Sequence, residues 1–232
     1  MKRRAIPIAA VGASVLLVML AVVVTRSSAN AAGSQVAADA GQHQHGNLPV
    51  PKSPVQIAFH DQMRKLWEDH VTWTRLAIVT FADGSGGFDA TASRLLQNQA
   101  DIGNAIKPFY GDAAGTALSG LLHDHITIAV ELLQAAKAGD TAAFNDANTR
   151  WYANANDIAD FLSAANPRLW PDDVMRASMK THLDQTLAEA AHELGGQYAA
   201  SVIDYEAIHL HMLDMADLLS SGIIGQFPMK FH

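Results

Sequence analysis

The sequence contains no cysteine among its 232 residues. The chain therefore cannot build a disulfide, a thiolate metal site or a cysteine nucleophile. Metal ligands among its side chains are left to 11 histidines, 8 methionines and the carboxylates. Charged residues are also few, at 17%, and acidic ones prevail, so that the net charge is −7. This balance argues against a nucleic-acid partner, because such proteins need a basic surface to displace phosphate counterions.

Familiar catalytic motifs are missing as well. We find no glycine-rich phosphate loop after a strand, no G-x-S-x-G and no H-E-x-x-H. Nucleotide-binding and hydrolase functions are therefore disfavoured, and whether the protein is an enzyme stays open. Apolar residues make up 49% of the chain, which is enough for one globular domain with a core.

Residues 1–31 have the pattern of an export segment. Basic residues at positions 2–4 precede an uncharged, mostly apolar run over 5–24. The run fits either a signal peptide, with Ala29-Asn30-Ala31 as a cleavage site, or a membrane anchor through residues 5–24. Both alternatives place the rest of the chain outside the cytoplasm. Residues 32–53 are rich in Ala, Gly and Gln and predict a flexible linker.

From residue 54 onwards, apolar residues recur with a helical period, and no strand alternation appears. Cap and turn signals predict six helices over about 54–81, 89–107, 112–139, 141–166, 171–194 and 197–221. Ser53 and Gln56 form a capping box at the first helix, and Pro108 is expected to end the second. Long helices joined by short turns fold back on one another. The prediction is an all-α, up-and-down antiparallel bundle of three helical hairpins spanning 54–232.

Each predicted helix carries an apolar stripe that a polar residue interrupts near its middle. When each hairpin is reflected about its turn, the interrupting residues of the last four helices fall at one height. They are His125, Asn154, His182 and His209. The same reflection sets His70 beside Asp101 in the first hairpin, and the match of this pair to the common layer is weaker.

Imidazoles that converge with a carboxylate or amide can form the first shell of a transition metal. Met179 and Met212 are each three residues from a layer histidine, and thioether with imidazole suits copper. The nearby carboxylates of Glu68, Asp101 and Glu131 would instead favour iron, manganese or zinc, so the metal is not distinguished. The predicted metal ligands are His70, Asp101, His125, Asn154, His182, His209, Met179 and Met212. A carrier, a sensor and a small redox protein all fit this prediction.

The same residues can serve structure alone, because buried histidines often bond to neighbouring groups and methionines fill cores. The competing function is a ligand-free helical interaction module. Glu189-x-x-His192 and Glu206-x-x-His209 match the motif of di-iron bundles, but they lie out of register on adjacent helices, which indicates chance. His211 is expected on the solvated side with Asp214. Protein partners are not indicated by any motif.

Several segments resemble a small, largely uncharacterised family of all-helical bacterial proteins. The resemblance covers most of residues 55–228. It rests on Leu66-Trp67-Glu68-Asp69-His70-Val71-Thr72-Trp73-Thr74-Arg75, Lys107-Pro108-Phe109-Tyr110-Gly111, Arg150-Trp151-Tyr152-Ala153-Asn154-Ala155, Met215-Ala216-Asp217 and Gln226-Phe227-Pro228. It implies a helical fold and supplies no functional residues. Transferase or amino-acid-kinase labels are attached to such sequences, but nothing in these residues supports a nucleotide site.

Overall fold

The structure, a computed structural model, describes residues 49–232. This part of the chain consists of helices joined by short turns and contains no strand, which confirms the all-α prediction. Its helices are α3 (Pro54–Ala82), α4 (Phe88–Tyr110), α5 (Asp112–Ala138), α6 (Thr141–Ala165), α7 (Asp172–Leu194), α8 (Tyr198–Gln226) and the short 3-10 helix η3 (Pro228–Phe231). The predicted export segment and most of the predicted linker, residues 1–48, lie outside the described residues.

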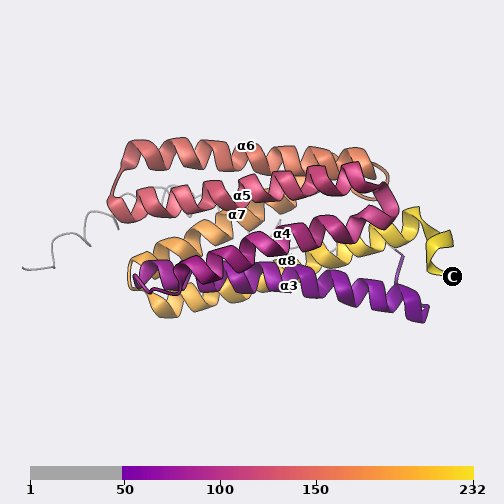
Figure 1. Ribbon diagram of the computed structural model, residues 1–232, viewed down its shortest axis with the longest axis horizontal. Helices are drawn as coiled ribbons and strands as arrows, with labels where there is room; N and C mark the ends of the chain where they lie inside the picture. The colour runs from indigo at the N-terminus through magenta and orange to yellow at the C-terminus, as the bar shows by residue number, and fades with distance from the viewer. Residues whose placement is uncertain (1–48) are drawn as a thin grey trace, which may run out of the picture.

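The six long helices run up and down along one axis (Figure 1). Each packs against the next in the chain, and α8 returns to pack against α3, so that the helices close into a ring. In addition, α3 contacts α7 across this ring. The helices enclose a large core and a small second cluster of Ile78, Leu133 and Ala190. Polar side chains from α3, α5 and α7 meet inside the bundle. None of the helices in the described range is long and apolar enough to cross a membrane.

The start of α3 agrees with the prediction from the sequence, whereas α4 and α8 end later than predicted. Ser53 and Gln56 form the expected capping box. Pro108 does not end α4, which continues to Tyr110 and stops at Gly111, whose φ of 87° favours glycine. Proline removes only one backbone donor, and here it does so in the last turn of the helix. Helix α8 runs about a turn beyond the expected end at residue 221.

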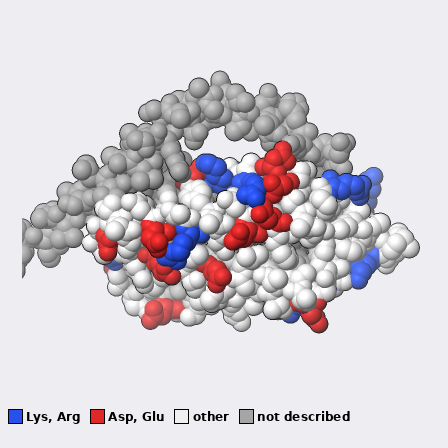
Figure 2. Space-filling model, turned by 90° about the horizontal axis from the view of Figure 1, so that it is seen from above, with Lys and Arg blue, Asp and Glu red and all other residues white. Residues whose placement is uncertain are grey.

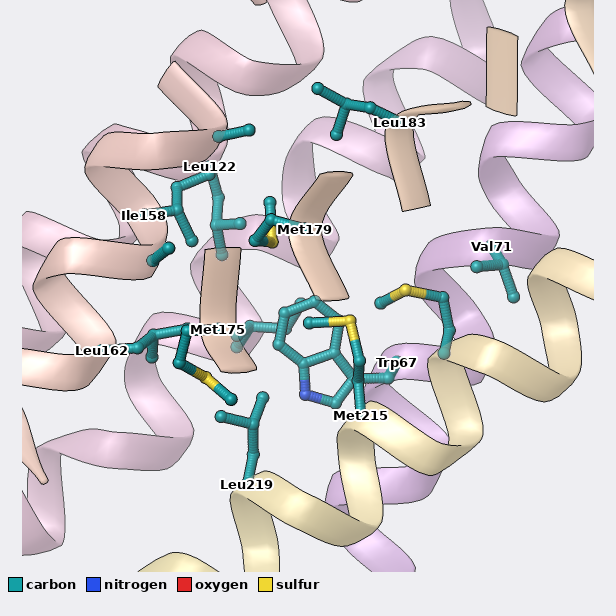
Figure 3. Packing of buried hydrophobic residues seen from close by; sticks show 14 of the residues in the cluster. Trp67, Val71, Leu122, Ile158, Leu162, Met175, Met179, Leu183, Met215 and Leu219 are labelled. Carbon is teal, nitrogen blue, oxygen red and sulfur yellow. The ribbon is translucent and has the colours of Figure 1, made fainter. Parts of the chain in front are cut away.

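The core is built of aliphatic, methionine and tryptophan side chains. In Figure 3 the side chains of Met175, Met179 and Met215 lie around the indole ring of Trp67. All four residues are buried. Flexible thioethers fill the irregular space beside a large aromatic ring, which is the usual role of methionine in a core.

The turn between α6 and α7 is fastened to α8 by Trp170 and Asn166. The Nε1 of Trp170 donates a hydrogen bond to the Leu218 carbonyl (3.2 Å), and the Nδ2 of Asn166 donates one to the Gly222 carbonyl (3.0 Å). The indole lies directly against Gly222, where an added Cβ would come within 2.0 Å of Nε1. Glycine is therefore required at this position by close approach, although its φ is ordinary.

Acidic and basic side chains are intermixed on the face shown in Figure 2. Two arginines each bridge neighbouring helices. Arg150 of α6 pairs with Glu131 of α5, and Arg176 of α7 pairs with Asp160 of α6. Exposed pairs of this kind contribute little to stability, so the fold depends on its core.

Replacement of Gly222 by alanine should destabilise the bundle, because the new methyl group collides with the Trp170 indole. Overpacking of this kind costs about 1–3 kcal/mol in the free energy of unfolding. Urea unfolding followed by circular dichroism measures the change. The matched control is Gly120→Ala in α5, where nothing lies within 4 Å of the added Cβ. That variant should gain roughly 0.5–1 kcal/mol from helix propensity, and a similar gain in Gly222→Ala would contradict the packing argument.

Candidate functional site

Three buried histidines from three helices meet inside the bundle. His70 lies on α3, His125 on α5 and His182 on α7, and each is at most 4% exposed. The ring centre of His182 lies 5.9 Å from that of His70 and 6.0 Å from that of His125. His182 therefore stands between the other two. We call His70, His125 and His182 the histidine cluster.

The apolar stripes place these histidines in the interior. His70 follows the buried Met63 and Trp67 along α3 at helical spacing, and His182 follows the buried Met175 and Met179 along α7. Residues three or four apart share one face of a helix, so a histidine in such a series must point into the core. The direct packing of α3 on α7 then brings the two rings together.

Asn154 of α6 fixes the orientation of His125. The Nδ1 of His125 lies 2.9 Å from the Oδ1 of Asn154, while the Nδ2 of Asn154 donates to the Leu121 carbonyl (3.1 Å). Because an amide oxygen can only accept, Nδ1 of His125 carries the proton, and the lone pair of the neutral ring is at Nε2. The indole of Trp151 stacks on the same ring at 5.3 Å. This arrangement leaves Nε2 as a potential ligand.

The histidine cluster borders a small cavity of about 50 Å³. Its lining contains the three imidazoles, two threonines and the indole of Trp151, and the remaining lining residues are aliphatic or phenyl. The threonine hydroxyls are already engaged. Thr74 donates to the His70 carbonyl and Thr186 to the His182 carbonyl, each at 2.8 Å.

Several buried polar atoms around the histidine cluster have no hydrogen-bond partner within residues 49–232. They include the Nδ1 of His182 and the indole nitrogens of Trp67 and Trp151. The Nδ1 of His70 and the Oδ1 of Asn98 also lack a hydrogen bond of good geometry, although the two side chains are close enough for Asn98 to act on the pKa of His70. An unpaired buried polar group costs roughly 1–3 kcal/mol. A group of such atoms in one layer is unusual in a core that serves packing alone.

Burial also controls the charge of the histidine cluster. Desolvation lowers the pKa of His70 to about 4, opposed by the amide of Asn98. Desolvation and the repulsion of a charged His70 lower the pKa of His125 to about 3, opposed by Asn154. The pKa of His182 falls well below its usual value for the same two kinds of reason. At neutral pH all three rings are uncharged, which is the form that binds metals.

Two predicted ligands, His209 and Asp101, lie outside the histidine cluster. His209 reaches the surface between α8 and α3, where its Nε2 lies 3.2 Å from the Oε1 of Glu68 and its ring stacks on Tyr205. Asp101 is 43% exposed in its side chain and faces Arg94 at 3.7 Å. Reflection about the turns gives the height of a residue but not the side of the helix on which it falls. On α4 the buried polar residue is Asn98, whose Nδ2 donates to the Leu66 carbonyl of α3.

Met179 and Met212 are buried in the apolar core, and neither lines the cavity. Asn154 does lie beside the histidine cluster, through its bond to His125. In the described part of the chain, no three histidine, aspartate or glutamate side chains are placed so that they could hold a metal ion as they stand. The histidine cluster is thus a set of neighbouring rings rather than a formed ligand cage.

A fourth histidine near this layer was not anticipated. His211 of α8, expected on the solvated side, lies against α7, where its Nε2 meets the Ser178 carbonyl at 2.9 Å. Desolvation lowers its pKa, and a charge on it would lower the pKa of His182 further. His211 lies three residues after Ile208 and four before Met215, and both of these are buried. This spacing is the signal in the sequence that could have placed His211 on the buried side of α8.

A buried ionic network, also not anticipated, lies further along α3 and α7. Arg75 donates to Glu189 (3.0 Å) and pairs with Glu193 (3.1 Å), and it also bonds to Ser201 of α8. Ser201 donates to Glu193 at 2.6 Å. Burial raises the pKa of Glu189 to about 7, opposed by Arg75. His192 does not join Glu189 but pairs with Asp204 at 2.5 Å, in agreement with a chance origin of that Glu-x-x-His match.

Comparison of the chain with protein-family models, with curated proteins and with solved structures finds no match. The resemblance to a family of helical bacterial proteins stays a prediction, because none of these comparisons bears on it.

The free energy of unfolding of the metal-free protein should fall as the pH is lowered below 6.5. An unfolded histidine titrates near 6.5, whereas His70 and His125 bind protons only near pH 4 and 3 in the folded state. Between these values the unfolded chain binds more protons, so each histidine contributes a slope of at most about 1.4 kcal/mol per pH unit. Glu189 acts in the opposite direction between about pH 4.5 and 7.

The substitution His70→Gln isolates one of these contributions. Urea unfolding between pH 4.5 and 6.5 should show a flatter dependence on pH than in the unsubstituted protein, by up to about 1.4 kcal/mol per pH unit. His123→Gln is the matched control, because His123 is half exposed and lies outside the histidine cluster. Equal slopes in the two variants would contradict the assignment.

Removal of Arg75 should destabilise the bundle strongly, since it leaves two carboxylates buried without their cation. Breaking a buried ion pair from one side costs about 3–5 kcal/mol. Arg75→Met should show this loss in urea unfolding, and the triple variant with Glu189→Gln and Glu193→Gln should recover most of it. Arg176→Met, which removes an arginine from the surface, is the control. Its free energy of unfolding should change by at most about 1 kcal/mol. A small effect of Arg75→Met would show that the network is not essential to stability.

Proposed function

We propose that the protein is an exported helical bundle that binds a transition-metal ion at the histidine cluster, as a carrier, a sensor or a small redox protein. The observation that carries the proposal is the meeting of three uncharged, buried imidazoles from three helices at one cavity. Uncharged imidazole is the commonest metal ligand of proteins. The basic start and the apolar run of residues 1–31 support export.

The size of the cavity favours an ion over an organic ligand. Small-molecule sites are usually clefts of about 300–1,000 Å³, whereas this cavity measures about 50 Å³. On the same measure of volume, a single water molecule needs about 10–15 Å³. The cavity therefore has room for an ion with one small further ligand.

Modest movement of the side chains would complete the site. Two nitrogens bonded to one tetrahedral ion at about 2.0–2.1 Å lie roughly 3.4 Å apart. Ring centres at 5.9 and 6.0 Å permit such a separation once each ring turns a nitrogen toward a shared point. Because the rings do not hold this arrangement as they stand, binding requires their rotation.

The hydrogen bond between His125 and Asn154 is of the kind that orients histidine ligands in metal sites. A ligating histidine usually donates its other ring nitrogen to a carboxylate or carbonyl, which fixes the tautomer and the orientation of the ring. Asn154 accepts from Nδ1 of His125 in this manner. His125 is therefore the ligand that is best prepared for binding.

One observation favours a second function, a ligand-free interaction module with structural histidines. The described residues contain no ready-made group of three ligands. Under this alternative the three rings would serve packing, and no ion would stabilise the protein. The experiment below separates the two functions.

Full-length protein purified without chelator should carry about one equivalent of a transition metal. After the metal is stripped, adding it back at about 100 times the dissociation constant should stabilise the fold by roughly 2.7 kcal/mol, which thermal unfolding detects as a rise in Tm. His70→Ala, His125→Ala and His182→Ala should each lose most of this rise. His209→Ala should keep it, because His209 lies outside the cavity.

A background variant with His43→Ala and His45→Ala removes the histidine pair that precedes the bundle, so that only binding within the bundle is counted. If the protein retains no metal and copper, zinc, iron and manganese all leave Tm unchanged, the ligand-free function is correct.

A further inference from the structure

We infer that the protein docks on a membrane surface with the end of the bundle at which the chain enters. Three observations carry this inference. Exposed apolar side chains gather at that end, two lysines beside them have no carboxylate partner in the described part of the chain, and residues 1–48 join the bundle there, at Pro49. The inference goes beyond metal binding and does not depend on it.

The start of α3 and the helix η3 form this end together. The Oγ of Ser53 donates a hydrogen bond to the Phe231 carbonyl (3.3 Å), and Pro49 lies against Gly225 near the end of α8. In Figure 1 the start of α3 and η3 extend farther along the bundle axis than the turns between α4 and α5 and between α6 and α7. We call residues 49–57 and 228–232 the entry end. A flat surface that approaches the bundle from this side meets the entry end first.

Four of the exposed large apolar side chains in residues 49–232 belong to the entry end. They are 45% to 79% exposed, and they are Val50, Val55, Ile57 and Met229. Side chains on a helix tilt toward its N-terminus, so Val55 and Ile57 in the first turn of α3 lean toward the end of the bundle. Scattered apolar residues on a surface need no explanation, whereas a group of them at one place marks an interaction surface.

An open groove continues the apolar surface beside the entry end. It measures about 690 Å³, lies between α3, α4 and η3, and is lined in part by Val55, Phe59, Phe109 and Phe231. Polar lining residues such as Asp101 lie further from the end of the bundle along α4. The apolar area that a lipid chain can contact is therefore larger than the four exposed side chains alone.

Two lysines flank these side chains, Lys52 before α3 and Lys230 in η3. Neither pairs with a carboxylate in the described part of the chain, whereas most other lysines and arginines there do. The Nζ of Lys230 donates instead to the Pro108 carbonyl (2.5 Å), which is uncharged. Apolar side chains next to basic ones are typical of surfaces that lie in the membrane interface, where the apolar groups enter the acyl boundary and the cations bind lipid phosphates.

The carboxylates nearest to this surface lie behind it. No aspartate or glutamate belongs to the entry end. Asp112 and Asp173 lie in the first turns of α5 and α7, beside the turns that Figure 1 shows set back, and the cations Lys107 and Arg168 lie in the same region. The charge that a membrane would meet first is therefore positive.

The position of the tether favours a membrane over a second copy of the chain. Residues 5–24 are uncharged and mostly apolar, and residues 25–48 between this run and Pro49 span at most about 85 Å when fully extended. A bilayer that holds the run is thus within reach of the entry end. In an isologous dimer the same surface meets itself, so that Lys52 and Lys230 would lie near their own copies and repel them.

The test uses the full-length protein on vesicles of equal parts phosphatidylglycerol and phosphatidylcholine. Since the chain has no cysteine, one introduced cysteine carries an NBD dye, whose emission and quenching by aqueous iodide report contact with lipid. Met229→Cys places the dye at the entry end. The matched control is Leu210→Cys, because Leu210 is also apolar and exposed but lies in α8, which contains no lysine or arginine.

We expect the dye at position 229 to be shielded from iodide severalfold better than the dye at position 210, with its emission shifted to the blue. Lys52→Ala and Lys230→Ala should each lower the ratio of docked to undocked protein roughly fivefold, since a lysine near an anionic surface strengthens binding by about this factor. Val50→Ser should lower the ratio as well. Lys137→Ala should leave it unchanged, because Lys137 bonds to the Phe81 carbonyl at the other end of the bundle.

Equal shielding at positions 229 and 210, or none at position 229, would overturn the inference. Shielding that both lysine variants leave unchanged would also contradict it. If position 229 becomes shielded without vesicles as the protein concentration rises, a second copy covers the entry end and the inference is wrong. None of these outcomes bears on metal binding at the histidine cluster, which the metal titrations test separately.

Discussion

The cost of burying imidazoles in an apolar bundle is the constraint on which the interior of this protein depends. His70, His125 and His182 come from helices that are distant in the chain, and all three lie at the centre. Desolvation removes their charge and lowers their pKa values. His125 has its Nδ1 paired through Asn154, whereas the Nδ1 of His182 has no hydrogen-bond partner among residues 49–232.

The ionic network of Arg75 lies in the neighbouring layer of the same helices. It also buries polar groups, but there they are charged and paired with one another. Its two carboxylates are held by one guanidinium and by Ser201, so the buried charges are paired. The two layers share α3 and α7, which contact each other directly across the ring of helices. The network is satisfied by its own partners, whereas the histidine layer has buried nitrogens that lack a hydrogen-bond partner in the described part of the chain, beside a cavity. This contrast is why the histidine cluster, and not the network, is the candidate for a ligand.

Much of the fold could be predicted from the sequence, because helical periodicity, caps and short turns are local signals. Six helices, their order and the capping box of Ser53 follow from such signals. The continuation of α4 past Pro108 does not, since a proline in the last turn removes only one donor and the next glycine ends the helix. The close packing of Trp170 on Gly222 also depends on contacts between distant residues.

The sequence by itself determined which histidines interrupt apolar stripes, and this selected His70, His125 and His182 together with Asn154. Only the tertiary structure decided which of the other candidates join them. The rotation of α8 and α4 about their own axes turns His209 and Asp101 outward and Asn98 inward. Periodicity gives the height and approximate face of a residue, but a helix that packs against two neighbours sets its rotation by the fit of all its side chains. The same fit buries Met179 and Met212 in the core and brings Arg75 to Glu189, which no local pattern encodes.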